Sequence, residues 1–316
     1  MKTTSKYLLL ISFCFFVCKQ TFAQADLLSM LDSVQKPKSH EKVFATFKTT
    51  KLINAQSTET VKKNTLDFRI THRFGDIGGE SGGGFHTWYG WDAISDVRLA
   101  FDYGITDKMT VGIARSKYDE NIDGTFKYRL LDQTTDNKIP VSVALYENMA
   151  VTPERSTELY NGTTIAASDE KFAHRISYVN QLIIARKFNS SFSFEVLPTY
   201  MHMNFVKDYI NPDNGAEAEN DLFSLGAGGR IKLTKRLCII VDYFYTFSKF
   251  RQNNPTNPYY MPLAIGIEIE TGGHVFHLDF TNAAGINENA FLPYSPDSWF
   301  KGGFKFGFNI SRVFNL

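Results

Sequence analysis

Apolar and polar residues alternate with a period of two along most of this chain. In the segment TLDFRITHRF at 65–74, the apolar Leu66, Phe68 and Ile70 are separated by charged or polar residues. Because successive side chains on a strand point to opposite faces, this pattern puts apolar groups on one face and charged groups on the other. Helical spacing is hard to find after residue 42. The pattern therefore predicts a protein built from strands.

The same alternation recurs in strand-length runs as far as the C-terminus. Most runs reach the ~9–11 residues that cross a bilayer at a tilt, whereas an average soluble strand has ~5–6. One face is almost purely apolar and aromatic, as in 237–247, which suits contact with lipid. The predicted strands lie at or near 64–74, 97–104, 109–114, 126–130, 141–145, 175–188, 191–206, 222–234, 237–250, 259–271, 274–282 and 299–314.

The connections between these runs are of two kinds. Short turns are expected at 104–108, 134–138, 189–191, 234–236 and 272–273, and longer polar loops at 75–95, 117–124, 149–173, 207–221, 251–258 and 283–298. A strict alternation of short periplasmic turns and longer outer loops is typical of outer-membrane barrels. The sequence thus predicts an all-β fold, a transmembrane up-and-down antiparallel β-barrel. The alternative is a soluble lipocalin-like barrel or sandwich with these apolar faces inward.

The number of strands follows from parity. If both ends of the barrel lie in the periplasm, the run 64–74 is the first of twelve strands, and fourteen would result if the pattern hides one more run. The run KVFATFKTTKLIN at 42–54 does not fit as a barrel strand. We therefore expect residues 24–63 in the periplasm or folded into the lumen, with a short amphipathic helix at 26–34, and the barrel over 64–316.

The N-terminus has the organisation of a signal peptide. Lys2 and Lys6 precede an apolar run at 7–17, and the small-residue site of a signal peptidase follows, ending at Ala23. The apolar run is too short to span a bilayer, which makes a retained membrane anchor the weaker alternative. Cleavage after Ala23 predicts export to the outer membrane of a Gram-negative cell.

Composition narrows the class of protein further. Residues 1–23 hold three of the 34 Lys and Arg residues and none of the 33 acidic ones, which leaves 31 basic against 33 acidic residues. A nearly neutral chain offers no basic excess for nucleic acid. Cys14 and Cys18 leave with the signal peptide, so Cys238 remains alone. An exported chain with one cysteine has no internal disulfide and no thiolate metal site.

The glycine-rich stretch GDIGGESGGGFHTWYGW at 75–91 invites comparison with a phosphate-binding loop. Such a loop follows a strand and opens a helix, and it carries a Lys-Ser/Thr pair for a nucleotide. This stretch has no such lysine and connects two predicted barrel strands, so we expect it to form the first outer loop. Its side chains His86, Trp88, Tyr89 and Trp91 would fold over the barrel mouth as a cap or offer a stacking platform for a ligand.

Catalytic and metal-binding patterns are weak. His274 and His277 are three apart, which puts them on opposite faces of a strand, so they cannot chelate one ion together. No metal site and no cofactor are predicted. An outer-membrane hydrolase would use a histidine and a serine on adjacent strands, and His202 with Ser191 or Ser193 is the nearest match.

Charged residues are expected to line the lumen. A two-residue turn at Gly272-Gly273 pairs Glu268 with His277 and places Glu268, Glu270, His277 and Asp279 on one inward-facing patch. Two carboxylates at i and i+2 lie about 6.5–7 Å apart, which could suit an inverting glycosidase, but the stronger interpretation is the acidic half of a salt-bridge network. The cations available to oppose this patch are Arg69, Arg73, Arg98, Lys127, Arg129, Arg230, Lys232, Lys301 and Lys305.

Three stretches resemble an uncharacterised outer-membrane β-barrel family of Bacteroidota. They are HRFG at 72–75, the block WYGWDAISDVRLAFDYGITDKMTVGIARS at 88–116, and ATFKTTKLIN at 45–54. The part of the block that spans two strands and the Gly-Ile-Thr-Asp turn is the most specific. The resemblance covers most of the mature chain and implies a barrel in the outer membrane. It assigns no catalytic residue and no substrate.

Twelve strands enclose a lumen between that of eight-stranded barrels, which side chains fill, and that of sixteen-stranded aqueous channels. A narrow channel or a solute-binding barrel is therefore the preferred function. A structural or docking barrel for a periplasmic or surface partner is the alternative, and a hydrolase is third. The expected partners are outer-membrane lipid, a small polar solute and a periplasmic protein.

Overall fold

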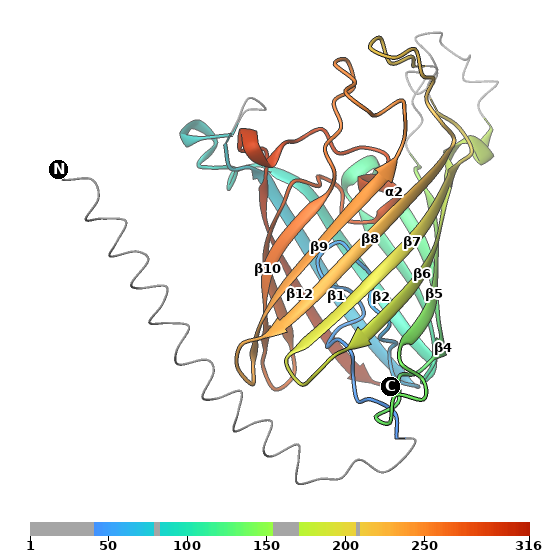
Figure 1. The fold of residues 1–316 in the computed structure, drawn as a ribbon. Helices are drawn as coiled ribbons and strands as arrows, with labels where there is room; N and C mark the ends of the chain where they lie inside the picture. The colour runs from blue at the N-terminus through green and yellow to red at the C-terminus, as the bar shows by residue number, and fades with distance from the viewer. Residues whose placement is uncertain (1–40, 79–82, 154–170, 207–208) are drawn as a thin grey trace, which may run out of the picture.

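The chain forms one closed β-barrel of twelve antiparallel strands, shown in Figure 1. The computed structural model describes residues 41–78, 83–153, 171–206 and 209–316. Each strand pairs with its neighbours in sequence, and β1 closes the barrel against β12. The predicted all-β fold, the up-and-down order and the strand number are confirmed.

The strands are 7 to 13 residues long and are joined by short helical turns at several loops. Their bounds are β1 Thr65–Asp76, β2 Ile94–Thr106, β3 Met109–Ser116, β4 Ile122–Leu131, β5 Ser142–Val151, β6 Ile176–Lys187, β7 Phe192–Met203, β8 Asp221–Lys232, β9 Leu237–Phe247, β10 Leu263–Glu270, β11 Val275–Thr281 and β12 Lys305–Asn315. The helices are η1 Phe85–Thr87, η2 Tyr118–Glu120, η4 Phe172–Arg175, α2 Glu288–Phe291 and η5 Trp299–Lys301.

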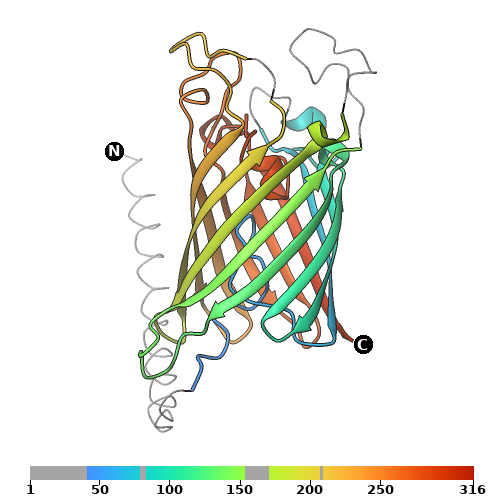
Figure 2. The same ribbon diagram turned by 90° about the vertical axis from the view of Figure 1, so that its right-hand side faces the viewer.

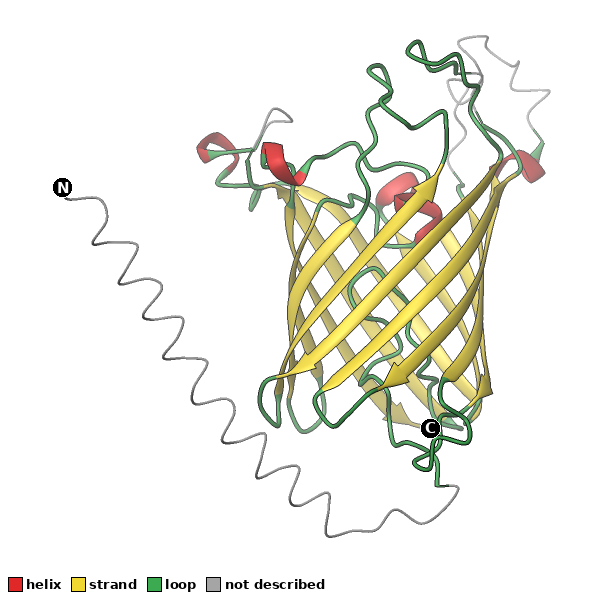
Figure 3. Cartoon of the chain, viewed as in Figure 1, coloured by secondary structure: helices red, strands yellow, loops and turns green. Residues whose placement is uncertain are grey.

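The two ends of the barrel differ, as the loops drawn in green in Figure 3 show. The connections at 107–108, 132–141, 188–191, 233–236 and 271–274 lie at one end, which we call the turn end. Most connections at the opposite end, the loop end, are longer: 77–93, 152–175, 204–220, 248–262 and 282–304. The exception is 117–121, where the sequence predicts a longer loop, because β4 begins already at Ile122.

Inward and outward faces have opposite chemistry. On β9, Leu237, Ile239 and Val241 face outward, while the alternating Cys238 and Asp242 are buried inside the barrel. The soluble alternative is therefore wrong, because it requires the apolar faces to point inward. No helix of the described residues is long and apolar enough to cross a membrane.

Residues 41–64, here called the N-terminal segment, begin at the turn end, pass into the barrel and form no barrel strand (Figures 1 and 2, blue). Its apolar side chains Leu52 and Ile53 are buried against the inner wall. Two wall positions without side chains leave room for it. A Cβ on Gly104 would lie 2.0 Å from the carbonyl oxygen of Lys62, and one on Gly228 would lie 2.7 Å from the Leu52 side chain. The expected helix at 26–34 lies outside the described residues.

A loop from the opposite end also enters the lumen. Residues 282–298, here called the inner loop, carry α2, all of whose residues are buried. Phe291 packs edge-on against Phe244 of β9, with ring centroids 5.1 Å apart. The lumen is thus filled from both ends by the chain itself.

The alternation of turns and loops predicts which connections face outside. A cysteine introduced at Asp213, between β7 and β8, should react with a membrane-impermeant maleimide on intact cells. A cysteine at Asp136, in the connection between β4 and β5, should react only after the outer membrane is permeabilised. The native Cys238 is buried and gives the unlabelled control. Labelling at Asp136 alone on intact cells would show the opposite orientation.

Candidate functional site

One carboxylate holds the tip of the N-terminal segment. Oδ2 of Asp242 on β9 accepts hydrogen bonds from the backbone N–H groups of Ile53 (3.0 Å), Asn54 (2.8 Å) and Ala55 (3.2 Å). Hydrogen bonds to an ionised acceptor are stronger than those between neutral groups. Three consecutive amides converging on one oxygen fold the segment into a turn against the wall.

Two cations of the wall hold the residues on either side of this turn. Nζ of Lys127 on β4 donates to the carbonyl oxygens of Thr50 (2.7 Å) and Ser57 (3.0 Å) and to Oε1 of Gln56 (3.1 Å). Nη2 of Arg69 on β1 donates to Oγ1 of Thr50 at 2.6 Å. Lys127 donates only to the segment, whereas Arg69 also pairs with Asp67 of the wall, so neither cation lines a free aqueous surface.

Arg73 joins the N-terminal segment to the inner loop. Its Nη2 donates to Oδ1 of Asn54 at 2.5 Å, and its Nη1 donates to the carbonyl oxygen of Ala283 at 3.2 Å. Nζ of Lys51 makes a second link, because it donates to the carbonyl oxygen of Ile286 at 2.8 Å. The two elements that fill the lumen therefore touch each other as well as the wall.

At the turn end, a cluster of charges fixes the point where the segment enters. Nη2 of Arg129 lies 3.1 Å from Oε2 of Glu59, and Nζ of Lys42 lies 2.8 Å from Oδ2 of Asp132. Partial burial alone would raise the pKa of Asp132, but the hydrogen bond and charge of Lys42, with Arg129 and Lys108, outweigh it and lower the pKa. Asp132 is ionised and acts as an anchor near neutral pH.

The structure brings three of the four residues of the expected acidic patch together. Oε1 of Glu268 and Oε1 of Glu270 lie 2.7 and 3.1 Å from Nη2 of Arg230, and Oε2 of Glu268 lies 3.3 Å from Nε2 of His277. Lys48 of the N-terminal segment approaches Oε2 of Glu270 at 3.0 Å. Both glutamates are thus ion-paired, which supports the salt-bridge interpretation over a glycosidase pair. Asp279 stands apart from these pairs, between Gly266 and Gly307.

The basic residues do not form a wall that faces this patch. Among the nine expected cations, Arg230 contacts it directly. Others pair with acids of their own part of the wall, as in Arg69–Asp67 at 2.9 Å and Arg98–Asp123 at 2.5 Å. Lys305 pairs with Asp76 and Asp297 near the loop end, and Lys232 lies at the turn end of β8. The charges of the lumen are therefore organised as local pairs.

The placement of Lys301 in the lumen wall is wrong. Strand β12 begins at Lys305, and Lys301 ends the helical turn η5 in the loop before it. The chain reverses at Gly302, whose φ of 76° is in the left-handed region that glycine tolerates. Lys301 consequently lines a pocket at the loop end.

The aromatic residues of the first loop do not cap the barrel mouth. Trp91 stacks on the outward-facing Phe306 of β12, with ring centroids 5.1 Å apart, and so lies on the outside of the barrel. Trp88 and Tyr89 follow η1, which extends sideways from the barrel at the upper left of Figure 1, and His86 belongs to η1 itself. Trp88 remains 64% exposed. The structure therefore contradicts the cap that the sequence led us to expect.

The histidine–serine pair considered for hydrolysis is absent from the described residues. His202 lies on the outward face near the loop end of β7, where its Nδ1 is 2.8 Å from Oδ1 of Asp221. Ser193 is buried inside the barrel near the other end of the same strand, and Ser191 precedes that strand. The two serines are therefore too far along the strand to be activated by His202.

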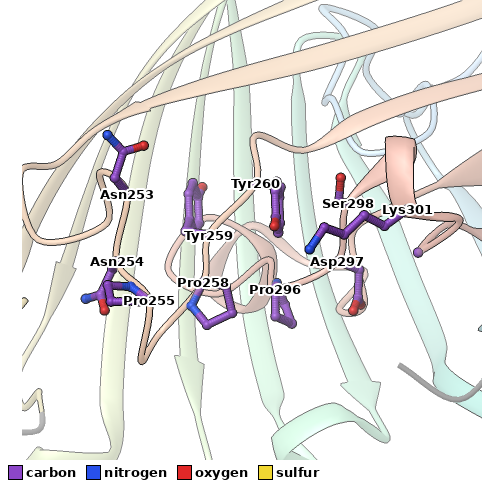
Figure 4. A pocket seen from close by; sticks show the side chains of 11 residues that line it. Asn253, Asn254, Pro255, Pro258, Tyr259, Tyr260, Pro296, Asp297, Ser298 and Lys301 are labelled. Atoms are coloured by element: carbon purple, nitrogen blue, oxygen red, sulfur yellow. The ribbon is translucent and has the colours of Figure 1, made fainter. Parts of the chain in front are cut away.

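A pocket of about 630 Å³ opens between two loops at the loop end, shown in Figure 4. Tyr259 and Tyr260 stand in its middle, flanked by Asn253 and Asp297. Burial raises the pKa of Tyr259 to about 12, and its hydroxyl donates to the carbonyl oxygen of Leu292 at 2.9 Å. Tyr259 thus ties the pocket to the end of α2. In the described residues, no cluster of three or more His, Cys, Asp or Glu could hold a metal ion.

Sequence reasoning missed several lumen residues. Asp242 and Glu195 occupy inward positions of predicted strands, so the same alternation that identified Glu268 would have found them. Glu195 is fully buried, and its carboxylate and the Leu52 side chain both border Gly228; neither carboxylate oxygen has a hydrogen-bond partner among the described residues. Glu288 of α2, which accepts a hydrogen bond from Gln56 at 3.1 Å, lies in a loop, where the alternation gives no signal.

The closed barrel with an apolar outer surface and a polar interior defines a membrane β-barrel of the outer-membrane type. The chain belongs to the family described as membrane-bound beta barrel domain (DUF5777), whose sequence model matches residues 47–314. The match begins within the N-terminal segment, so the family includes the part that fills the lumen. No curated protein is similar enough in sequence to count as a relative.

Several solved barrels have a similar course of the chain at very low sequence identity. The NanC porin is 8% identical with a TM-score of 0.45, and the likeness covers 79% of this chain and 99% of that one. An outer-membrane channel from Pseudomonas putida F1 is 9% identical with a TM-score of 0.48, covering 81% and 98%. The KdgM porin in complex with disordered oligogalacturonate is 7% identical with a TM-score of 0.43, covering 80% and 99%.

Weakening the Asp242 acceptor should loosen the segment without opening the barrel. In Asp242→Asn, the amides of residues 53–55 lose an ionised partner, which costs about 1.5–3 kcal/mol. Hydrogen exchange of these amides should accelerate roughly tenfold to a hundredfold, while exchange of the β9–β10 pairing stays slow. Asp76→Asn, which removes an ion pair that does not touch the segment, is the control. Equal exchange in both variants would contradict the role of Asp242.

The anchor at the turn end should be sensitive to acid. Because the folded pKa of Asp132 is depressed, its stabilisation is complete above the ordinary aspartate value of 3.8 and is lost as pH falls through the folded value. The Val43 amide, which donates to the Gln133 carbonyl at 2.7 Å, should keep its protection above pH 3.8 and lose it as the pH falls below that value, after correction for intrinsic exchange. Asp132→Asn should remove this step, and a step that persists in that variant would assign it to another group.

Proposed function

We propose that this protein is an outer-membrane barrel with a narrow lumen that its own N-terminal segment and inner loop close, and that a small polar solute passes or binds when they move. The observation that carries the proposal is the set of hydrogen bonds that hold the segment to the wall, beside the apolar contacts of Leu52 and Ile53. Asp242, Lys127 and Arg73 all hold the segment by hydrogen bonds to backbone or amide groups. Water can replace these hydrogen bonds when the segment leaves, whereas a lumen filled by apolar packing alone would resist hydration.

The rest of the proposal follows from this arrangement. Residues 1–23 would act as the signal peptide, the turn end would face the periplasm, and the motifs at 72–75 and 103–116 support a source among Bacteroidota. An unplugged lumen would present ion pairs and the carboxylates of Glu195, Glu268 and Asp279. Such an interior favours small hydrated solutes over apolar ones.

A second candidate is a docking barrel whose closed lumen is permanent. Phe44, at the turn end where the segment enters, is 85% exposed. An exposed aromatic side chain at this entry point is a suitable contact for a periplasmic protein. In that case the lumen network would serve to hold residue 44 and its neighbours in place, and conduction would play no part.

Planar-bilayer recordings separate the two candidates. The full-length mature chain should conduct rarely, and deletion of residues 41–58 should produce sustained currents, because the wall groups released from the segment become hydrated. Neutralising Glu268, Glu270 and Asp279 together in the deletion variant should shift ion preference toward anions, since Arg230 then loses its partners. The shift should shrink as salt rises, because screening weakens the field.

The control for folding is heat modifiability on a detergent gel, since a closed barrel migrates faster before boiling. A folded deletion variant that stays closed is examined again with residues 283–290 of the inner loop replaced by glycine and serine. Silence of that second folded variant would reject the channel and favour the docking barrel.

A further inference from the structure

The outward wall carries a polar strip where lipid contact calls for apolar side chains. Glu147 on β5, Asn180 on β6 and Tyr200 on β7 face outward as neighbours in one row, because the register pairs Glu147 with Asn180 and Asn180 with Tyr200. The pair His202–Asp221 continues the strip toward the loop end. The outward positions of β9, by contrast, are all apolar or aromatic.

Glu147 and Asn180 lie near the middle of the membrane-spanning region. A row of paired residues runs across tilted strands, so it slants from one end of the barrel to the other. This row starts near the turn end of β1 and finishes at the loop end of β9, and Glu147 and Asn180 are the fifth and sixth of its nine positions: Leu66, Tyr103, Val111, Phe126, Glu147, Asn180, Tyr200, Phe223 and Phe247.

Neither polar side chain is satisfied within the barrel. Glu147 and Asn180 are exposed, and neither side chain makes a hydrogen bond or ion pair with the described residues. Hydrocarbon offers no hydrogen-bonding partner, so polar groups at this depth are costly unless another molecule covers them. The acceptors and donors at this site therefore need a second molecule.

The wall is hollowed at the same place. A depression of about 560 Å³ is lined by Phe126, Glu147, Asn180 and Tyr200, among others. Gly124 contributes to it because it has no side chain, and a Cβ there would meet open space. Small residues let neighbouring backbones approach closely in membranes, and the half-buried ring of Phe126 forms part of the lining of this depression.

We propose that this surface binds a second copy of the chain about a two-fold axis. Such an axis makes the contact isologous, so that Asn180 of each protomer donates from its amide to Glu147 of the other, and the two depressions face each other. The patch is complementary to itself. Glu147 could instead pair with an arginine on a different outward face of a second copy. The outward-facing arginines of the described strands lie toward strand ends, away from the depth of Glu147: Arg115, Arg186 and Arg312.

Exchange of the two residues tests this geometry. The full-length mature protein should be a dimer in dodecyl maltoside micelles by light scattering, and Asn180→Glu should weaken the dimer about tenfold or more, because carboxylates then face each other. The double variant Glu147→Asn with Asn180→Glu swaps donor and acceptor on both protomers and should restore the dimer. A partner other than a second copy would not be restored by the swap.

Crosslinking in phosphatidylcholine vesicles provides the second measurement. A cysteine at Met149, which lines the same depression, should form crosslinked dimers with a short bismaleimide, whereas one at Ile239 on β9 should not. Heat modifiability verifies folding, and Asn180→Leu replaces Asn180→Glu in the comparison if the latter fails to fold. The proposal would be overturned if the unaltered protein were monomeric in both media, or if it carried a bound amphiphile on this surface. It would also be overturned if the swap variant dimerised no more strongly than Asn180→Glu.

Discussion

The width of a twelve-stranded barrel is the constraint on which the rest of this structure depends. Inward side chains from opposite walls do not meet across such a bore, so a polar lumen must hold water or a further piece of protein. Here the N-terminal segment and the inner loop supply that protein. Their backbone amides and carbonyls supply hydrogen bonds to Asp242, Lys127 and Arg73. Burial of these charges is tolerable because each is hydrogen-bonded, and it would be costly otherwise. The same reasoning applies to Glu195, whose carboxylate has no hydrogen-bond partner in the part of the chain that the structure describes.

The fold could be predicted from the sequence because strands on a barrel obey one rule throughout. The alternation along Thr65–Asp76 or Leu237–Phe247 indicates which face of the strand contacts lipid. Closure of the barrel then fixes the neighbours of every strand. The pairing of Glu268 with His277 followed from turn geometry alone. Lys301 was misplaced because the loop before β12 contains alternating residues too, and only the reversal at Gly302 distinguishes it from a strand. The alternation of apolar and polar residues does not reveal a residue with a left-handed backbone conformation.

The candidate site could not be predicted in the same way, for two physical reasons. Hydrogen bonds from the backbone of Ile53, Asn54 and Ala55 carry no signature in side-chain type, so the sequence cannot announce them. Contacts between Lys51 and Ile286 join residues from opposite ends of the chain, with no regular element to set their register. The outward strip was overlooked for a different reason. Glu147 and Asn180 are each a single polar residue on a largely apolar outward face, and taken alone neither attracts attention. Only the register shows that they lie side by side.

The N-terminal segment runs without interruption into β1, the strand that seals the barrel against β12. A force applied to the N-terminus would therefore reach two kinds of contact in turn. The segment is held by a looped set of bonds that can break one after another, starting from the anchor at Lys42 and Asp132. The pairing of β1 with β2 and β12 lies along the direction of pull, so that all its hydrogen bonds would be loaded together. Tension would peel the segment out of the lumen well before it could shear the wall. Under tension the N-terminal segment would therefore leave the lumen while the strand pairing of the barrel remains intact.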